Sequence, residues 1–393
     1  MITLGQSPTD PAFVQNPYPF YENARALGPF FRWSDYNMIC TGNWAAISAI
    51  FRDRRFGREA PAELAPVIPA HLKPFYAVEA HSMLELEPPR HTRLRSLVLR
   101  AFTSRRIAEL APEISSLSHQ LIDGLPSGDF DLLQHFGQKL PVIIIARLLG
   151  VPEAMSDDLL LWSNAMVGMY MAGRTPAREA AAIAATTAFV DFMRTYIEQR
   201  RAKPADDLIT SLIQAEGAGD KLSTDELIST CILLLNAGHE ATVHTIGNGV
   251  KALLQSGTSA AALGAQAIDA TVEEILRFDP ALHMFTRWAY AEVEVMGHTF
   301  QRGDQVALLL GAGNRDPAQW EEPGTFRPSR AVKPHASFGA GLHFCVGAPL
   351  ARLELQIALP ILFSRLPGLK LAQPPLYKDV YHFHGLDRLM LRR

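Results

Sequence analysis

The sequence predicts a mainly α-helical fold with small β-sheets, in a single domain over residues 1–393. A nearly continuous helical pattern covers 232–255, and amphipathic patterns cover 178–202 and 108–123. Strand-like segments are short and bounded by turn residues, as in 30–33, 38–40, 292–296 and 305–310. No internal repeat, low-complexity linker or change of composition divides the chain. These observations favour one helix-rich domain with accessory sheets.

The composition is typical of a packed globular protein, with 48% hydrophobic and 20% charged residues. Lys and Arg number 37 against 40 Asp and Glu, so the formal charge of -3 disfavours a nucleic-acid partner. The first ten residues, MITLGQSPTD, do not resemble a secretion signal, and no apolar run is long enough to cross a membrane. We therefore expect a cytoplasmic protein with no membrane partner.

Three cysteines are present, and their spacing predicts neither a disulfide framework nor a CxxC metal site. Cys40 and Cys231 lie in apolar stretches, where a cysteine is usually a small buried hydrophobe. Cys345 differs because glycines surround it and a helical pattern starts directly after it. A helix N-terminus stabilises an anion, so a thiolate at Cys345 is a plausible metal ligand.

The segment 338–348 reads FGAGLHFCVGA and allows three other interpretations. A dinucleotide-binding loop would need a third glycine and a preceding strand, neither of which is evident. A zinc site with His343 and Cys345 lacks a second pair of ligands nearby. A glycine-rich turn with a buried cysteine stays open on these residues alone. Gly339, Gly341 and Gly347 would equally let the backbone approach a flat cofactor.

The run FGAGLHFCVGAPLAR resembles the haem-binding loop of the cytochrome P-450 family. The resemblance implies that haem b (iron protoporphyrin IX) lies between a long central helix and the cysteine-bearing helix. It further implies that Cys345 ligates the iron and that Phe338, Gly339 and Gly347 contact the cofactor. Similar matches extend from near residue 86 to the C-terminus.

Two further segments resemble structural motifs of the same family. Glu274 and Arg277 in VEEILRF match its Glu-x-x-Arg pair, and 314–330 matches the segment that closes on this pair through an arginine. Arg327 or Arg330 would supply that arginine. We assign these residues to a buried charge network that supports the fold and the haem seat, and not to the chemistry.

Four cationic or imidazole side chains match family positions that bind the haem propionates. They are His91 and Arg95 in HTRLR, Arg287 in FTRWA and His343 in the cysteine loop. Buried carboxylates need such partners.

The segment AGHEAT resembles the oxygen-binding kink of the family's central helix. Ala237 and Gly238 would lie closest to haem and oxygen, and Glu240 matches the acidic member of the proton-delivering pair. Ala241 stands where the family usually has a threonine, and Thr242 is shifted by one residue, about 100° around the helix. We expect ordered water, Glu240 or a polar group of the substrate to complete proton delivery.

The resemblance implies a monooxygenase that uses dioxygen and receives electrons from a ferredoxin and its reductase. Mostly apolar residues are expected around the pocket, which favours a small apolar or aromatic substrate. The expected wall comes from 70–86, Met166–Met171, Leu234, Ala237, Ala241, Leu282–Phe285 and Tyr381–Phe383. A basic surface for the redox partner would include Arg93, Arg100, Arg105 and Arg106. The alternatives are a peroxide-driven haem-thiolate enzyme and a non-catalytic haem sensor.

Overall fold

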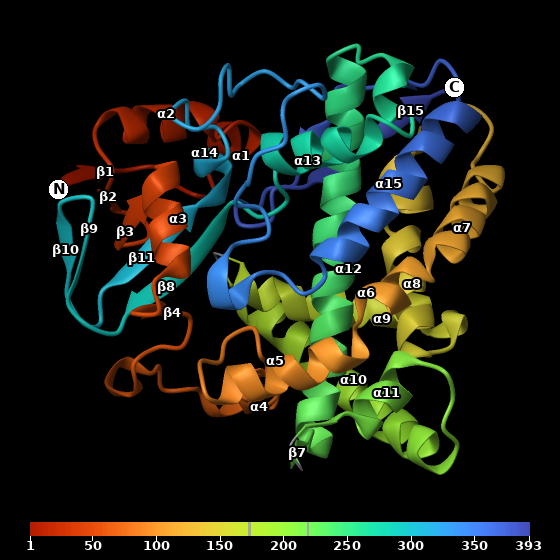
Figure 1. The fold of residues 1–393 in the computed structure, drawn as a ribbon, viewed down its shortest axis with the longest axis horizontal. Helices are drawn as coiled ribbons and strands as arrows, with labels where there is room; N and C mark the ends of the chain where they lie inside the picture. The colour runs from red at the N-terminus through yellow and green to blue at the C-terminus, as the bar shows by residue number, and fades with distance from the viewer. Residues whose placement is uncertain (172–173, 218–219) are drawn as a thin grey trace.

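The computed structural model describes residues 1–171, 174–217 and 220–393 and is mostly helical (Figure 1). The long helix α12 (Thr224–Gln255) runs through the middle of the helical part of the molecule. The cysteine-bearing segment leads into α15 (Ala348–Arg365), which crosses close to α12. The predicted fold class, mainly α with small β-sheets, is confirmed.

Helix α12 begins with a capping box, in which Ser223 accepts from the N–H of Glu226 and the Glu226 carboxylate accepts from the N–H of Ser223. Its 32 residues give a length of about 48 Å. Most of its side chains are buried, because α8 (Lys139–Leu149), α9 (Ser156–Val167) and α10 (Pro176–Ala202) pack around it. The helix therefore forms the centre of the core.

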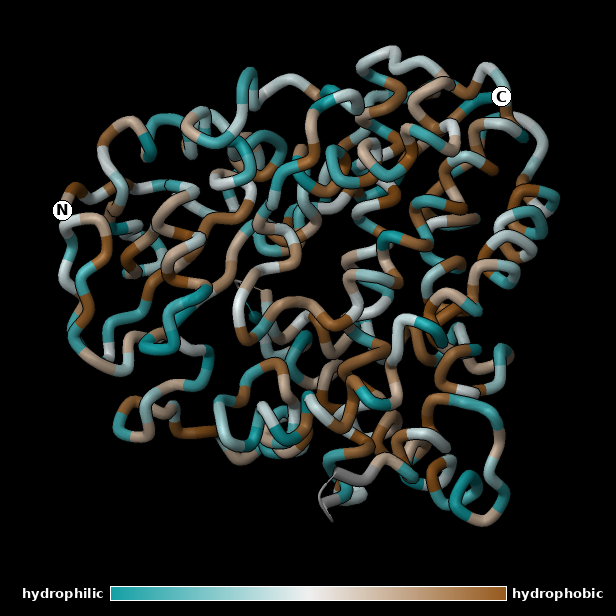
Figure 2. The backbone as a smooth tube through the Cα atoms, viewed as in Figure 1, coloured by the Kyte–Doolittle hydropathy of each residue, from teal (hydrophilic) through white to brown (hydrophobic). Residues whose placement is uncertain are grey.

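The other helices cover this centre. Helix α7 (Ala111–Asp123) packs along α15, and α13 (Ile268–Phe278) contacts both α12 and α15. Apolar and polar residues alternate along these helices in Figure 2, as expected for helices with one buried side. The remaining helices are α1 (Pro11–Gln15), α2 (Tyr18–Ala26), α3 (Trp44–Arg52), α4 (Lys73–Glu79), α5 (Arg90–Ala101), α6 (Ser104–Ala108), α11 (Leu208–Gln214) and α14 (Leu310–Gly313).

A six-stranded mixed sheet lies beside the helices, near the N-terminus (Figure 1). Its order is β1 (Ile2–Leu4), β2 (Phe31–Trp33), β3 (Met38–Thr41), β11 (Gln305–Leu309), β8 (Met284–Ala289) and β4 (Phe56–Gly57). The hairpin of β9 (Val293–Val295) and β10 (His298–Phe300) projects from it. All four predicted strand segments are confirmed, whereas β8 was not predicted.

The smaller strands form three minor sheets. They are β5 (Phe130–Asp131), β6 (Glu216–Gly217), β7 (Asp220–Lys221), β12 (Lys370–Leu371), β13 (Leu376–Tyr377), β14 (Leu386–Arg388) and β15 (Met390–Arg392). Among the described residues, none of the helices combines the length and the apolar character that crossing a membrane requires.

Candidate functional site

Cys345 lies between a short 3₁₀ turn and the first turn of α15. Its backbone N–H donates to the carbonyl of Phe338 at 3.0 Å, which closes the loop. Burial raises the pKa of the Cys345 thiol, while the N–H groups of Gly347 and Ala348, together with Arg95, act in the opposite direction. The loop thus places hydrogen-bond donors around the sulfur, as a thiolate ligand requires.

Gly341 shows why glycine is needed in this loop. Its φ is +69°, and a Cβ at this position would lie 2.2 Å from the carbonyl oxygen of Phe51 on α3. Any larger residue would separate the loop from α3.

Two patches of exposed surface occur in the interior of the helical part. Cys345 is surrounded by protein atoms that desolvate its thiol, yet the residue keeps exposed surface; Ala237 is also exposed, although most of α12 is buried. Gly238 and Ala241, one residue and one turn further along α12, are half-buried. No described side chain covers these surfaces, which is what a flat cofactor between α12 and the cysteine loop would need.

Arg287 on β8 is only 3% exposed and has no carboxylate partner among the described residues. Its guanidinium donates to the carbonyl of the adjacent Thr286 at 2.8 Å and lies over the ring of Phe51. Burial, and secondarily the positive charge of Arg58, lower its pKa to about 9. A buried arginine without a carboxylate is costly, so this position fits an anionic group of a ligand.

His343 lies close enough to Arg287 to interact with it electrostatically, and its ring centroid is 4.3 Å from that of His91. Nε2 of His343 lies 2.8 Å from the carboxylate of Glu87, which also accepts from the N–H of Arg58. Burial and the nearby His343 lower the pKa of His91 to about 4. Nδ1 of His91 has no partner in the described part of the chain. The group of Arg287, His91 and His343 therefore fits the two carboxylates that haem carries.

Arg95, the fourth predicted propionate partner, contacts the cysteine loop itself. Its guanidinium donates to the carbonyl of Phe344 at 2.6 Å, one residue before Cys345. Burial lowers its pKa and Cys345 opposes that effect.

Arg58 and Glu87 were not singled out in the sequence. Arg58 pairs with Glu85 and stacks over Phe285, while Glu87 holds His343. Glu87 lies four positions before His91 but outside α5, so no helical spacing in the sequence marked it.

Glu240, the predicted acid, is buried on α12 between two histidines. Its Oε1 lies 3.0 Å from Nε2 of His244 and its Oε2 lies 3.4 Å from Nε2 of His239. Burial raises the pKa of Glu240, but the hydrogen bonds from His239 and His244 outweigh burial and hold it well below its usual value. Glu240 is therefore a carboxylate with two imidazole donors.

The hydroxyl of Thr242 donates to the carbonyl of Gly238 at 3.1 Å, and the hydroxyl of Thr245 donates to the carbonyl of Ala241 at 2.7 Å. Both hydroxyl groups thus bind the backbone of their own helix. Position 241, where the family usually has a threonine, is Ala241 and therefore carries no hydroxyl.

The expected pocket wall is only partly assembled. Leu282 pairs with Phe383, so these two segments lie side by side. Met166, Met169 and Leu234 are buried in the core. Tyr381 does not line this wall: it packs on Phe13 and Trp33 in the core next to the six-stranded sheet, and its hydroxyl bonds Tyr21.

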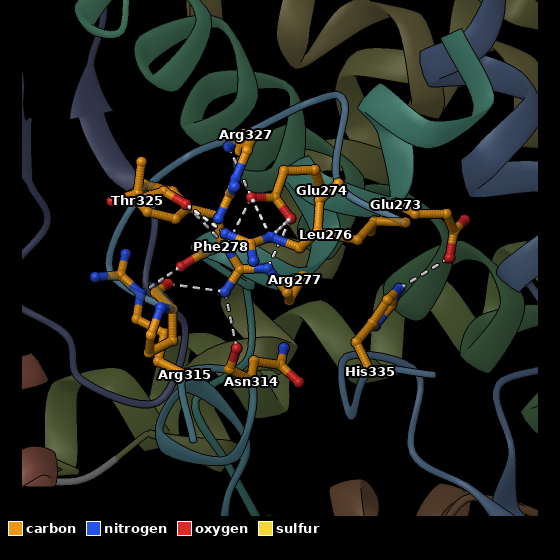
Figure 3. Close-up of polar contacts among 12 residues, drawn as sticks. Glu273, Glu274, Leu276, Arg277, Phe278, Asn314, Arg315, Thr325, Arg327 and His335 are labelled. Atoms are coloured by element: carbon orange, nitrogen blue, oxygen red, sulfur yellow. Dashed lines mark hydrogen bonds and ion pairs between the residues drawn. The ribbon is translucent and has the colours of Figure 1, made fainter. Parts of the chain in front are cut away.

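The predicted structural network is complete (Figure 3). Glu274 and Arg277 form two hydrogen bonds of 2.7 Å, and Arg277 also donates to the carbonyls of Asn314 and Pro323. The guanidinium of Arg330 reaches Glu274 at 3.3 Å. Arg327 contributes its backbone N–H to Glu274, while its side chain pairs with Glu322.

The predicted basic surface is largely neutralised. Arg93 pairs with Glu226, Arg105 with Glu109 and Arg106 with Asp206. Arg100 is exposed. A hollow of about 320 Å³ opens on the other side of the cysteine loop, between α3 and the residues Phe338–Gly341 and Arg352.

Comparison with known proteins places this arrangement in a family. The family model "Cytochrome P450" matches residues 266–368. A biotin biosynthesis cytochrome P450 of Bacillus subtilis is 34% identical over 99% of both chains. A vitamin D(3) 25-hydroxylase of Pseudonocardia autotrophica is 36% identical over 96% of this chain and 94% of its own. The crystal structure of P450BioI with an acyl carrier protein that bears hexadec-9Z-enoic acid superposes with a TM-score of 0.92, at 33% identity over 97% and 99% of the two chains.

The chain belongs to the cytochrome P450 family. It is a haem-containing monooxygenase that uses dioxygen and redox partners.

Proposed function

We propose that this cytochrome P450 inserts one oxygen atom of dioxygen into a small, largely apolar substrate, with haem b held by the thiolate of Cys345. The observation that carries the proposal is a set of buried, incompletely paired groups, Arg287 and His91, near a cysteine that accepts two backbone hydrogen bonds. Bound haem supplies the activation of dioxygen, which a thiolate ligand favours by pushing electron density toward the iron.

The side chains around Cys345 have distinct tasks in this proposal. The N–H groups of Gly347 and Ala348 stabilise the thiolate, and Arg95 fixes the loop through Phe344. Arg287, His91 and His343 bind the propionates. Phe338, Gly339 and Ala237 lie against the cofactor. The contacts of Gly347, Ala348 and Arg95 with the cysteine loop, and the exposed surface of Ala237, are already present in the folded chain.

The substrate proposal rests on the apolar residues beside the exposed part of α12. Ala237 and Ala241 on α12, and Leu282 and Phe285 near the start of β8, keep exposed apolar surface. The relatives include a polyketide biosynthesis cytochrome P450, PksS, and the structural neighbour P450BioI forms a complex with an acyl carrier protein that bears hexadec-9Z-enoic acid. A largely apolar substrate is consistent with both.

Proton delivery in this chain would not use the hydroxyl of Thr242, because that hydroxyl already bonds the carbonyl of Gly238. Glu240 with ordered water, or a polar group of the substrate, takes that place. Ala241→Thr tests this point: better coupling of electron use to product would show that a hydroxyl was missing, and unchanged coupling would contradict a special substrate role.

Electrons would come from a ferredoxin and its reductase. The test compares turnover with a surrogate ferredoxin system and with hydrogen peroxide alone. Equal or faster turnover with peroxide alone would favour the peroxide-driven alternative.

The haem proposal is tested by the absorption spectrum of the reduced protein with carbon monoxide. Wild type should show the long-wavelength band of a thiolate ligand, Cys345→Ser should lose it, and the matched control Cys40→Ser should keep it. A wild-type protein with a histidine-type carbonyl spectrum would overturn the proposal.

A further inference from the structure

A buried polar stripe continues along α12 beyond Glu240. Positions 240, 244, 248 and 251 fall on one side of a helix with 3.6 residues per turn, and they are Glu240, His244, Asn248 and Lys251. The first three are buried, and the side chain of Lys251 is 19% exposed. The stripe therefore connects the carboxylate near the exposed part of α12 with a group that solvent reaches.

Each member contacts polar groups from other elements. Nε2 of His244 donates to the carboxylate of Glu240 at 3.0 Å. The amide of Asn248 donates to the carbonyls of His384 and Asp279 at 2.9 and 3.1 Å. Lys251 lies 3.7 Å from the carboxylate of Asp279 and bonds the hydroxyl of Tyr377.

Five polar atoms along this stripe have no hydrogen-bond partner within the described residues. They are Nδ1 of His244, Oδ1 of Asn248, Nδ1 and Nε2 of His384, and Nε2 of His283. Buried polar groups are normally satisfied by protein or by ordered water. So many unpaired atoms in one contiguous region indicate bound water that bridges them.

Gly385 allows His244 to lie close to His384 and His283. A Cβ on Gly385 would lie 1.9 Å from Nδ1 of His244, so no other residue fits there without displacing the ring. The neighbouring His384 interacts electrostatically with His244 and stacks on His283, with ring centroids 4.3 Å apart. Hydroxyl groups of Tyr18 and Tyr21 and the guanidinium of Arg315 complete the surroundings.

A metal ion is a poor explanation for the cluster of Asp279, His283 and His384, although their ligand atoms lie within 4.8 Å of one another. The two imidazole rings are stacked with an interplanar angle of 18°, so their in-plane lone pairs lie in two separate, nearly parallel planes and do not meet at one ion. Asp279 also binds two tyrosine hydroxyls and faces Lys251.

We propose that His244 is a relay residue that passes protons from the Lys251 and His384 region, through ordered water, to Glu240. This inference rests on the proposed function, because Glu240 is the acid beside the oxygen site. Nδ1 of His244 takes up a proton from the water while Nε2–H gives its proton to Glu240. No charge remains on the ring, and the oxygen chemistry receives the proton that solvent supplied at Lys251.

The test compares His244→Gln and His244→Leu with the control His298→Gln. His298 also has a ring nitrogen without a partner among the described residues, but it lies in the β9–β10 hairpin. Glutamine retains a hydrogen-bond donor for Glu240 but cannot relay a proton as imidazole does. The readouts are the fraction of dioxygen released as hydrogen peroxide and the solvent isotope effect on dioxygen consumption, with a surrogate ferredoxin system and hexadec-9Z-enoic acid as the probe.

Both His244 variants should reduce the coupling of electron use to product about tenfold. This effect is smaller than the roughly 100-fold minimum expected for loss of a direct general acid, because water partly replaces the histidine. Peroxide-driven turnover, in which the oxidant brings its own protons, should stay within about twofold of wild type. His298→Gln should behave as wild type. A second variant, Lys251→Met, should show the same pattern more weakly because water also reaches the route.

Coupling at the wild-type level in His244→Gln would overturn the relay. Glutamine can still position Glu240 through a hydrogen bond, so such a result would mean that His244 only positions Glu240. A stoichiometric metal ion that His384→Gln abolishes would overturn it as well. The carbonyl spectra separate this inference from the proposed function. A thiolate band that stays intact in the His244 variants, together with lost coupling, supports both. A wild-type protein without the thiolate band refutes the proposed function itself.

Discussion

Two buried charge groups of this protein differ in how they are satisfied. The carboxylate of Glu274 pairs with both Arg277 and Arg330, and backbone carbonyls accept further donors of Arg277. Arg287 and His91 form the other group, in which a guanidinium has no carboxylate and an imidazole nitrogen has no partner in the described chain. The partners of the first group all belong to the protein, whereas the second group fits an anionic ligand.

Glu274→Ala should have the largest effect. It leaves Arg277 buried and unpaired, so the free energy of unfolding should fall by about 3–5 kcal/mol. Chemical denaturation of the haem-free and haem-loaded protein measures this. An equal fall in both forms is expected, because the network does not depend on the ligand, and a fall in the loaded form alone would contradict the comparison.

Arg287→Leu should weaken haem retention at least about 30-fold, the equivalent of about 2 kcal/mol for truncating one partner of a buried charge pair. The haem-free protein should be no less stable than wild type, because the substitution removes a buried cation that lacks a carboxylate. Haem transfer to an acceptor protein measures the first effect and denaturation measures the second. Destabilised haem-free Arg287→Leu would show that the arginine is structural.

Glu273 sharpens the comparison because it adjoins Glu274 but is only partly buried. Burial raises its pKa, yet Arg352 and His335 prevail and lower it to about 2. The folded pKa lies below the unfolded one, so this carboxylate stabilises the protein above about pH 4.5 and the contribution is lost as the pH falls toward 2. Between pH 2 and pH 4.5, the free energy of unfolding of wild type should therefore rise by about 2 kcal/mol relative to that of Glu273→Gln. Denaturation at several pH values measures this. Parallel pH profiles would contradict this.

Arg105→Ala should change least. The pair of Arg105 and Glu109 is exposed, so the unfolding free energy should change by less than about 0.5 kcal/mol. The same variant tests the predicted basic surface: a slower reaction with ferredoxin at low salt, with stability unchanged, would support it. Identical rates would remove Arg105 from that surface.

The sequence was sufficient to predict features that lie in one short continuous segment. The Glu274 and Arg277 pair is one helical turn, and the cysteine loop is eleven residues, so both were predicted in the correct structural context. The choice between Arg327 and Arg330 needed the structure, because both lie in the same irregular segment and each contributes a different group to Glu274.

Contacts between distant segments that no family motif covers were not predicted. Glu87 meets His343 across 256 positions, and Asn248 meets His384 across 136, so no local pattern announces either contact. The i, i+4 spacing of Glu240 and His244 was visible, but its meaning depended on Gly385. The roles of the individual site residues stay predictions.

The uninterrupted course of α12 restricts how this protein can change in evolution. A deletion of one residue between Glu240 and Lys251 would rotate the rest of the helix by about 100° and move every later side chain into the wrong neighbour. Insertions and deletions in this segment would therefore disrupt the core, and natural or engineered variation within it is limited to substitutions.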